Sequence, residues 1–103
     1  NLQVVNSKIS LESGFAVGEY NSVKRSGNIV AINAWLMGSI SADTPTKIGN
    51  IANASLRPSI TIRGICRSGR GVWGEYDIAT NGDISVRFMV NTGNVIMTST
   101  YVI

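Results

Sequence analysis

The sequence predicts an all-β fold, an antiparallel β-sandwich or barrel, and three observations lead to this prediction. The 11 glycines fall mostly between short segments in which apolar and polar residues alternate, the pattern of strands joined by turns. No segment repeats its apolar residues with the period of a helix. The length of 103 residues suits one domain with a modest core.

The longest predicted strand is "GNIVAINAWLMGSI", residues 27–40, which is rich in β-branched residues and bounded by Gly27 and Gly38. One face of this strand would carry Val30, Ile32, Ala34 and Leu36, and the other Ile29, Ala31, Asn33, Trp35 and Met37. Both faces are apolar enough to be covered. We expect the opposing sheet to cover one face and a neighbouring subunit to cover the other.

The remaining strands follow from the same alternation and from the turn residues between them. Residues 14–25 form one or two strands and end at a turn, Ser26-Gly27-Asn28. Residues 41–58 form mostly a loop, with a short strand at 47–51. Further strands are expected at residues 59–67, 72–79, 83–90 and 95–103, with turns at 68–71, 81–82 and 92–94.

The pairing of the last two hairpins can be predicted because a shift by one residue moves every side chain to the opposite face. A three-residue loop at 80–82 pairs Ile78 with Ile84 and Gly74 with Phe88, which gives a consistent apolar face and lets the Phe88 ring cover the glycine. A five-residue loop at 67–71 pairs Cys66 with Val72.

These registers place one strand's polar residues on the outside of the sheet. Trp73 is expected between Ile65 and Met89, Glu75 between Arg63 and Arg87, and Asp77 between Thr61 and Ser85. Direct neighbours lie about 4.5–5.5 Å apart at Cβ, so the charged side chains can pair. Cys66 then points into the core as a small buried hydrophobe rather than a nucleophile.

The composition excludes several classes of protein. Charged residues make up only 15%, against about 25% in an average domain, which indicates an oligomer that hides neutral surface; the alternative is a surface rich in Ser, Thr and Asn. The net charge is +3, without a long basic run, so no nucleic-acid partner is predicted. No apolar run approaches the roughly 20 residues of a membrane span. Without histidine and with one cysteine, neither a His-based triad nor a metal site is expected.

Two functions remain open for the outward residues. Glu75 and Asp77 share one strand face, close enough for a two-carboxylate glycosidase, but two arginine neighbours suit a salt-bridged group better than a general acid. Alternatively, the outward residues bind a sugar; they are Trp73, Asp77, Glu75 and Arg63. An aromatic ring can cover the apolar C–H faces of a sugar, and charged groups can form hydrogen bonds with its hydroxyls. On residues alone, packing of Trp73 under a neighbouring subunit is slightly favoured. Arg67 and Arg70 are either phosphate ligands or solvated loop charges.

The order of several motifs resembles that of the C-terminal head domains of phage tail receptor-binding proteins and tail fibres. The motifs are "GNIVAINAWLMGSI", "TPTKIG", "LRPSITIRGICRS", "IATNGDISVRF" and the final strand "VIMTSTYVI". They cover about residues 25–103. One departure is "IANASL", where many relatives carry Leu-Pro-x-Gly-Tyr/Phe, so that loop is expected to differ in shape.

The resemblance implies a homotrimeric head at the tip of a phage tail or baseplate, which recognises a host cell-wall or surface polysaccharide without catalysis or a cofactor. Heads of this kind hold the sugar with Trp, Asp and Arg, some also with His; the positions carried over are Trp73, Asp77 and Arg63, with Glu75 beside them. Residues 1–12 are expected to end a neck, shaft or linker and residues 13–103 to form the head. The chain starts at Asn1 rather than Met, which indicates the C-terminal fragment of a longer chain whose N-terminal part contacts other tail proteins.

Two alternatives to this function stay open. One is a structural tail or baseplate domain without a ligand, in which the outward face serves trimer packing. The other is a tailspike that cleaves polysaccharide. All three place the protein on the virion and, when it acts, outside the cell.

Overall fold

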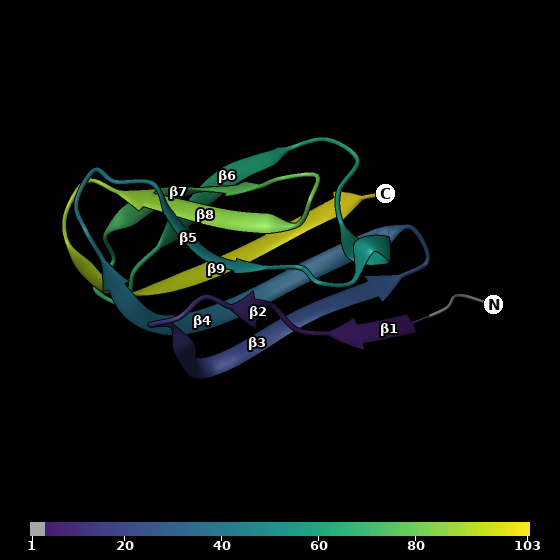
Figure 1. The fold of residues 1–103 in the computed structure, drawn as a ribbon, viewed down its shortest axis with the longest axis horizontal. Helices are drawn as coiled ribbons and strands as arrows, with labels where there is room; N and C mark the ends of the chain where they lie inside the picture. The colour runs from purple at the N-terminus through teal and green to yellow at the C-terminus, as the bar shows by residue number, and fades with distance from the viewer. Residues whose placement is uncertain (1–3) are drawn as a thin grey trace.

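The computed structural model describes residues 4–103, and this part of the chain forms nine strands and one short 3-10 helix (Figure 1). The elements are β1 (Val4–Ser7), β2 (Ser10–Leu11), β3 (Ala16–Ser26), β4 (Ile29–Ile40), β5 (Thr46–Asn50), η1 (Ala54–Leu56), β6 (Ile62–Arg67), β7 (Trp73–Ile78), β8 (Asp83–Phe88) and β9 (Thr92–Val102). The prediction of an all-β fold is confirmed. No helix in this range is long and apolar enough to cross a bilayer.

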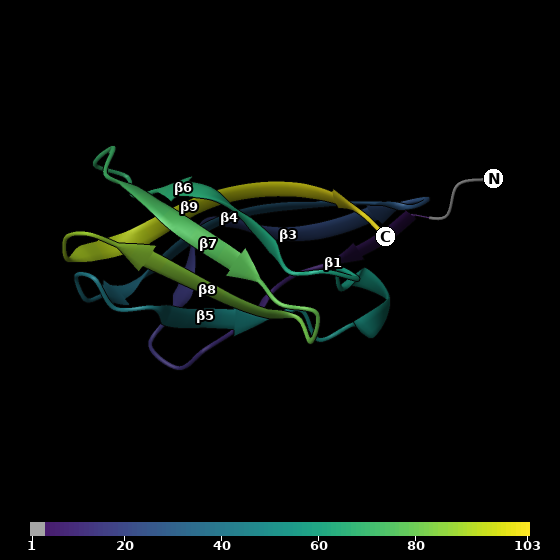
Figure 2. The same cartoon turned by 90° about the horizontal axis from the view of Figure 1, so that it is seen from above.

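All nine strands belong to one antiparallel sheet, in the order β1-β3-β4-β9-β6-β7-β8-β5-β2. The sheet curls, so that β3, β4 and β9 form one wall and β6, β7, β8 and β5 form the other (Figures 1 and 2). A single curled sheet thus produces the predicted sandwich or barrel, because its two walls enclose one core.

The first strands lie at the two edges of the sheet. β1 pairs with β3, whereas β2 pairs with β5 at the opposite edge. Between them, the backbone N–H of Ile9 donates to Oδ1 of Asn21 at 2.8 Å, and Nδ2 of Asn21 donates to the Ile9 carbonyl at 2.9 Å. Asn21 lies on β3, so its amide joins the two edges of the curl.

Residues 4–11 of the segment predicted as a neck or linker therefore contribute two strands to the sheet. Ile9 is also a core residue, with only 2% of its surface exposed. Residues 1–3 of the same segment lie outside the described residues. The boundary expected at residue 12 stays a prediction.

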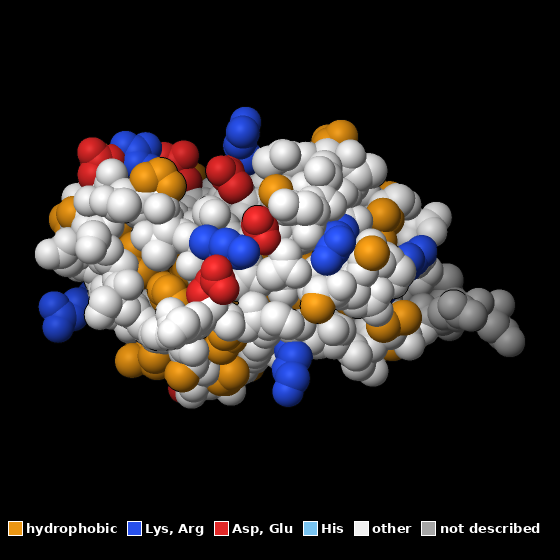
Figure 3. All heavy atoms as spheres, in the orientation of Figure 1, with side chains coloured by type: hydrophobic (Ala, Val, Ile, Leu, Met, Phe, Trp, Pro, Cys, Tyr) orange, Lys and Arg blue, Asp and Glu red, His pale blue; other side chains and the backbone are white. Residues whose placement is uncertain are grey.

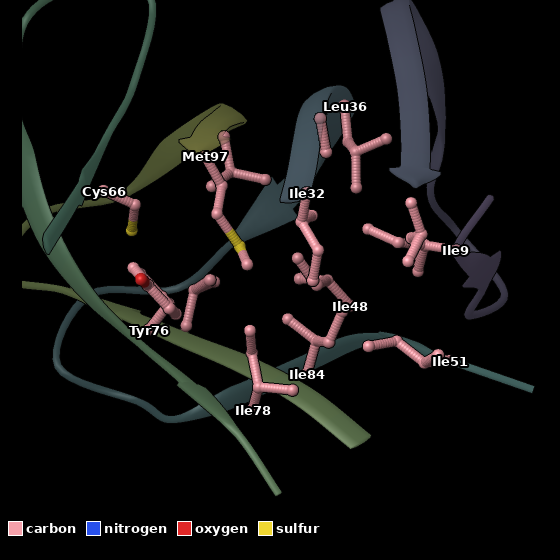
Figure 4. Close-up of a cluster of buried hydrophobic side chains, with 14 of the residues drawn as sticks. Ile9, Ile32, Leu36, Ile48, Ile51, Cys66, Tyr76, Ile78, Ile84 and Met97 are labelled. Atoms are coloured by element: carbon pink, nitrogen blue, oxygen red, sulfur yellow. The ribbon is translucent and has the colours of Figure 1, made fainter. Parts of the chain in front are cut away.

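The core lies between the two walls and follows the predicted alternation. Val30, Ile32, Ala34 and Leu36 of β4 are buried, while their neighbours on the strand face outward. They meet side chains from β5, β7, β8 and β9 in a common interior (Figure 4). Cys66 is among these buried residues, as predicted.

Several element boundaries differ from the prediction. β6 begins at Ile62 rather than residue 59, and the loop before it contains the unpredicted helix η1, whose N-cap Asn53 accepts the Ser55 N–H at 3.0 Å. The turn expected at 92–94 was wrong, because β9 already begins at Thr92. Thr92 pairs with Ile40 in the sheet, so the turn between β8 and β9 lies at residues 89–91. Oδ1 of Asn91 accepts the Ala42 N–H at 2.7 Å.

Two buried acids make the fold sensitive to high pH. Burial raises the pKa of the Cys66 thiol to about 11 and that of the Tyr101 phenol to about 12; the Tyr101 hydroxyl donates to the Leu56 carbonyl at 2.5 Å. The unfolded chain loses these protons at lower pH than the folded one, so stability is present below the unfolded pKa values and falls as pH rises.

Urea denaturation should therefore show a loss on the order of 2 kcal/mol between pH 8.5 and 11. The variant Cys66→Ala should show a smaller loss over the same range, because one of the two acids is gone. An identical pH dependence in both proteins would contradict this assignment.

Candidate functional site

The candidate site lies on the outer face of β7, the face of the sheet that points away from the core. Trp73, Glu75 and Asp77 are exposed there, while the intervening Gly74, Tyr76 and Ile78 are buried. Trp73 is 66% exposed. The predicted outward orientation of these three side chains is confirmed.

The β7–β8 register is also as predicted, with Ile78 opposite Ile84 and Gly74 opposite Phe88. A Cβ on Gly74 would lie 2.7 Å from both the Phe88 ring and the Arg87 carbonyl oxygen. The bare backbone of Gly74 is therefore what allows the Phe88 ring to lie over β7.

The predicted β6–β7 register was wrong by two residues. Arg67 pairs with Trp73 and Cys66 with Gly74, instead of Cys66 with Val72. A shift by two keeps every side chain on its face, so the apolar pattern alone could not distinguish the two registers.

The turn between β6 and β7 decides the register. Ser68 N–H donates to the Val72 carbonyl at 2.8 Å, and Gly71, with φ of 79°, donates to the Ser68 carbonyl at 3.0 Å. These bonds close the loop after Arg67. The Tyr76 ring also fits against Gly64, where a Cβ would lie 2.6 Å from the ring.

The new register changes the partners of the outward charges. Arg63 is paired with Asp77, Nε to Oδ1 at 3.2 Å, rather than with Glu75. Glu75 lies opposite Ile65 and keeps only Arg87 of its two expected partners, at 3.7 Å between Oε1 and Nη1. The charges sit beside one another in two exposed pairs. Such pairs contribute about 0–1 kcal/mol to stability.

Asp43 joins this group and was missed from the sequence. Its Oδ1 accepts from Arg87 Nε at 2.8 Å and also contacts Nη2. Asp43 has a positive φ of 54°, and its N–H donates to the Phe88 carbonyl at 2.7 Å. Asp43 and Arg87 are 44 residues apart in the chain. The backbone hydrogen bond from Asp43 to Phe88 of β8 brings them together.

We call Arg63, Asp77, Glu75, Arg87 and Asp43 the charged patch. A hollow of about 190 Å³ between β7 and β8 lies within it, and its lining includes Pro45, Glu75, Asp77, Ser85 and Arg87. Figure 3 shows basic side chains that stand apart and others that lie directly beside acidic side chains, as those of the charged patch do. Together they offer both acceptors and donors to a polar ligand.

A second feature of the outer face is a row of aligned residues that crosses five strands. The row, which we call the aromatic row, runs Tyr20, Trp35, Ile96, Arg67 and Trp73 from β3 to β7. It spans four inter-strand steps, roughly 19 Å along the sheet. A hollow of about 330 Å³ lies along it, lined by Tyr20, Arg67, Ile96 and Trp73 among others.

Trp35 lies on the apolar strand β4 as predicted, and it is partly exposed in the middle of this row. The indole lies over the backbone of Gly18 at the β3 bulge, where a Cβ would be 1.8 Å from the ring. Bulge and glycine together make room for the ring. The row itself was missed because it depends on the contact of β9 with both β4 and β6, which are distant in sequence.

Among residues 4–103, no three metal-ligating side chains gather at one point. The arrangement on the outer face is therefore one of an exposed indole, two arginines that contact acids, and further aromatic surface beside them. These side chains present hydrogen-bond donors and acceptors next to exposed aromatic surface.

No model of a known protein family matches the sequence, and no curated protein matches it. Among solved structures, the chain is similar to the head domain of phage bIL170, described with the receptor-binding domains of lactococcal phages. The TM-score is 0.81 at 7% sequence identity, and the match covers 98% of this chain and 99% of that chain. The suspected likeness to phage receptor-binding heads is thus confirmed in three dimensions: this chain has the fold of the bIL170 head domain.

Proposed function

We propose that this chain is the head of a phage tail receptor-binding protein and that it binds a saccharide of the host cell surface without cleaving it. The observation that carries the proposal is the exposed indole of Trp73 beside the charged patch, on a fold shared with a phage head domain. The proposed ligand residues are Trp73, Asp77, Glu75 and Arg63. Arg87 contacts Glu75 from the neighbouring strand, and Asp43 contacts Arg87.

The chemistry of these residues suits a sugar. The indole face covers apolar C–H groups, and the neighbouring charged groups form strong hydrogen bonds with hydroxyls. Among the described residues, Arg63 contacts only Oδ1 of Asp77, which leaves Oδ2 able to accept from a ligand. Arg63 is 77% exposed at its side chain, so its other N–H groups can donate to the same ligand.

The same geometry favours binding over hydrolysis. A glycosidase needs one carboxyl group kept protonated, usually by an apolar surrounding. Glu75 and Asp77 are instead exposed, and each contacts an arginine. We therefore propose a role without catalysis, metal or cofactor.

We further propose that three copies assemble through the outer face of β4. Ile29 and Met37 on that face are 51% and 43% exposed, and Val102, opposite Ile29, is 69% exposed. Trimeric display would raise the strength of weak single-site binding, because linked sites engage at high effective concentration. In this proposal the N-terminal side of the chain leads to other tail proteins of the virion.

The test uses cells of the host bacterium and their purified surface polysaccharide. We expect the fluorescent chain to bind the cells, the polysaccharide to compete for binding, and no new reducing ends to form during incubation. New reducing ends would favour the tailspike function. Failure to bind cells as an assembled protein would favour the purely structural role.

A further inference from the structure

A third hollow, of about 350 Å³, lies where the β6–β7 turn approaches the start of β9, and we call it the end hollow. Its polar wall consists of Ser68, Arg70, Asn91, Thr92 and Asn94. It has no lining residue in common with the hollows at the charged patch or the aromatic row. No acidic residue lines it.

The two asparagine amides of the end hollow are oriented by the backbone. Asn94 Oδ1 accepts the Gly69 N–H at 2.6 Å, and Asn91 Oδ1 accepts the Ala42 N–H at 2.7 Å. Because both oxygens are engaged by donors, each amide must carry its NH2 group at the other end. Neither NH2 group donates a hydrogen bond to any of residues 4–103, so both remain available as donors.

Two further groups of the end hollow lack a partner. Thr92 Oγ1 is the one buried side-chain polar atom without a hydrogen bond in residues 4–103. Burying such a group without a partner costs about 1–3 kcal/mol. Arg70 forms no ion pair within the described part of the chain.

We propose that the end hollow is a binding site for an oxyanion of the phosphate type, either free or as a substituent of a larger ligand. A guanidinium and two amide NH2 groups supply donors, and no carboxylate opposes the negative charge. Gly69 allows this arrangement, because a Cβ there would lie 3.1 Å from Nδ2 of Asn94. The inference does not depend on the saccharide platform at Trp73.

The test is a titration of the isotope-labelled 103-residue chain with inorganic phosphate at constant ionic strength, followed by backbone amide NMR. We expect saturable shifts at Gly69, Arg70, Thr92 and Gly93, and none when sodium chloride replaces phosphate. Arg70→Gln should weaken binding about tenfold or more, because a charge-assisted hydrogen bond is lost. Lys24→Gln removes an exposed cation on β3 that lines none of the three hollows, and it should bind phosphate as the wild type does.

Two more variants separate binding from folding. Thr92→Val keeps the side-chain shape and removes the buried unpartnered hydroxyl, so it should retain phosphate binding without lowering thermal stability. Asn94→Asp keeps an acceptor for Gly69 but places a negative charge in the end hollow, and should abolish binding. Shifts that do not saturate, or an unchanged affinity in Arg70→Gln, would overturn the proposal.

The source of the anion is resolved by comparing phosphate, glucose 6-phosphate and glucose at equal concentration. Tighter binding of glucose 6-phosphate than of phosphate would identify a phosphorylated glycan as the ligand, and equal binding a free oxyanion. Shifts of the same residues with glucose alone would contradict an anion site. These outcomes concern the end hollow alone. They do not depend on whether Trp73 is needed for binding to host cells.

Discussion

Replacing Phe88 with alanine is expected to lower the free energy of unfolding by about 3–5 kcal/mol. The Phe88 side chain is fully buried and covers the backbone of Gly74 in the next strand. Removing the ring leaves a cavity between the two walls that the glycine cannot fill. Domains of this kind are stable by only about 5–15 kcal/mol, so the variant should be partly unfolded at 37 °C.

The adjacent residue provides the control for this prediction. Met89 is 64% exposed, and Met89→Ala should change stability by no more than about 0.5 kcal/mol. Urea denaturation followed by tryptophan fluorescence measures both variants. A Phe88→Ala protein as stable as Met89→Ala would contradict the β7–β8 register.

Replacing Trp73 with alanine is expected to weaken saccharide binding about thirtyfold or more, the range of a central binding residue. The indole is the largest exposed apolar surface beside the charged patch, and 66% of the residue is accessible. Because the ring contributes little to the core, the fold should be retained. Host-cell adsorption and glycan binding by calorimetry both report the loss.

Two further measurements make this prediction specific. Ile60→Ala removes an apolar side chain that is equally exposed, at 69%, and lies off the aromatic row, so it should bind glycan normally. Sedimentation of Trp73→Ala tests the competing role in packing. Loss of the assembled state together with binding would show that Trp73 lies in a subunit contact.

The alternation of apolar and polar residues was enough to predict which face of each strand is buried. The β4 residues and the outward trio of β7 are placed as expected for this reason. The β7–β8 register was also accessible, because a one-residue error there would have placed Val86 and Phe88 outside.

The partners of the charged residues could not be predicted with equal success. The two candidate β6–β7 registers differ by two residues and bury the same side chains, so the hydrogen bonds of the Ser68–Gly71 turn make the choice. In the observed register, the ion-pair partner of Arg63 is Asp77 instead of the predicted Glu75. Asp43 reaches Arg87 through a loop with a positive φ, a conformation that no periodic pattern indicates.

The aromatic row was hidden for a topological reason. Local hairpins can be inferred from adjacent segments, but β9 lies between β4 and β6, and both contacts are long-range. Tyr20, Trp35 and Trp73 therefore gave no common signal in the sequence. The row places Tyr20 of β3 and Trp35 of β4 on the same outer face as Trp73.

The most direct test of the proposed platform is a crystal structure of the chain soaked with fragments of the host surface polysaccharide. We expect a sugar ring stacked on the Trp73 indole, with hydroxyls bonded to Asp77 and Arg63. A saccharide bound elsewhere on the head, with the Trp73 surface empty, would contradict the account.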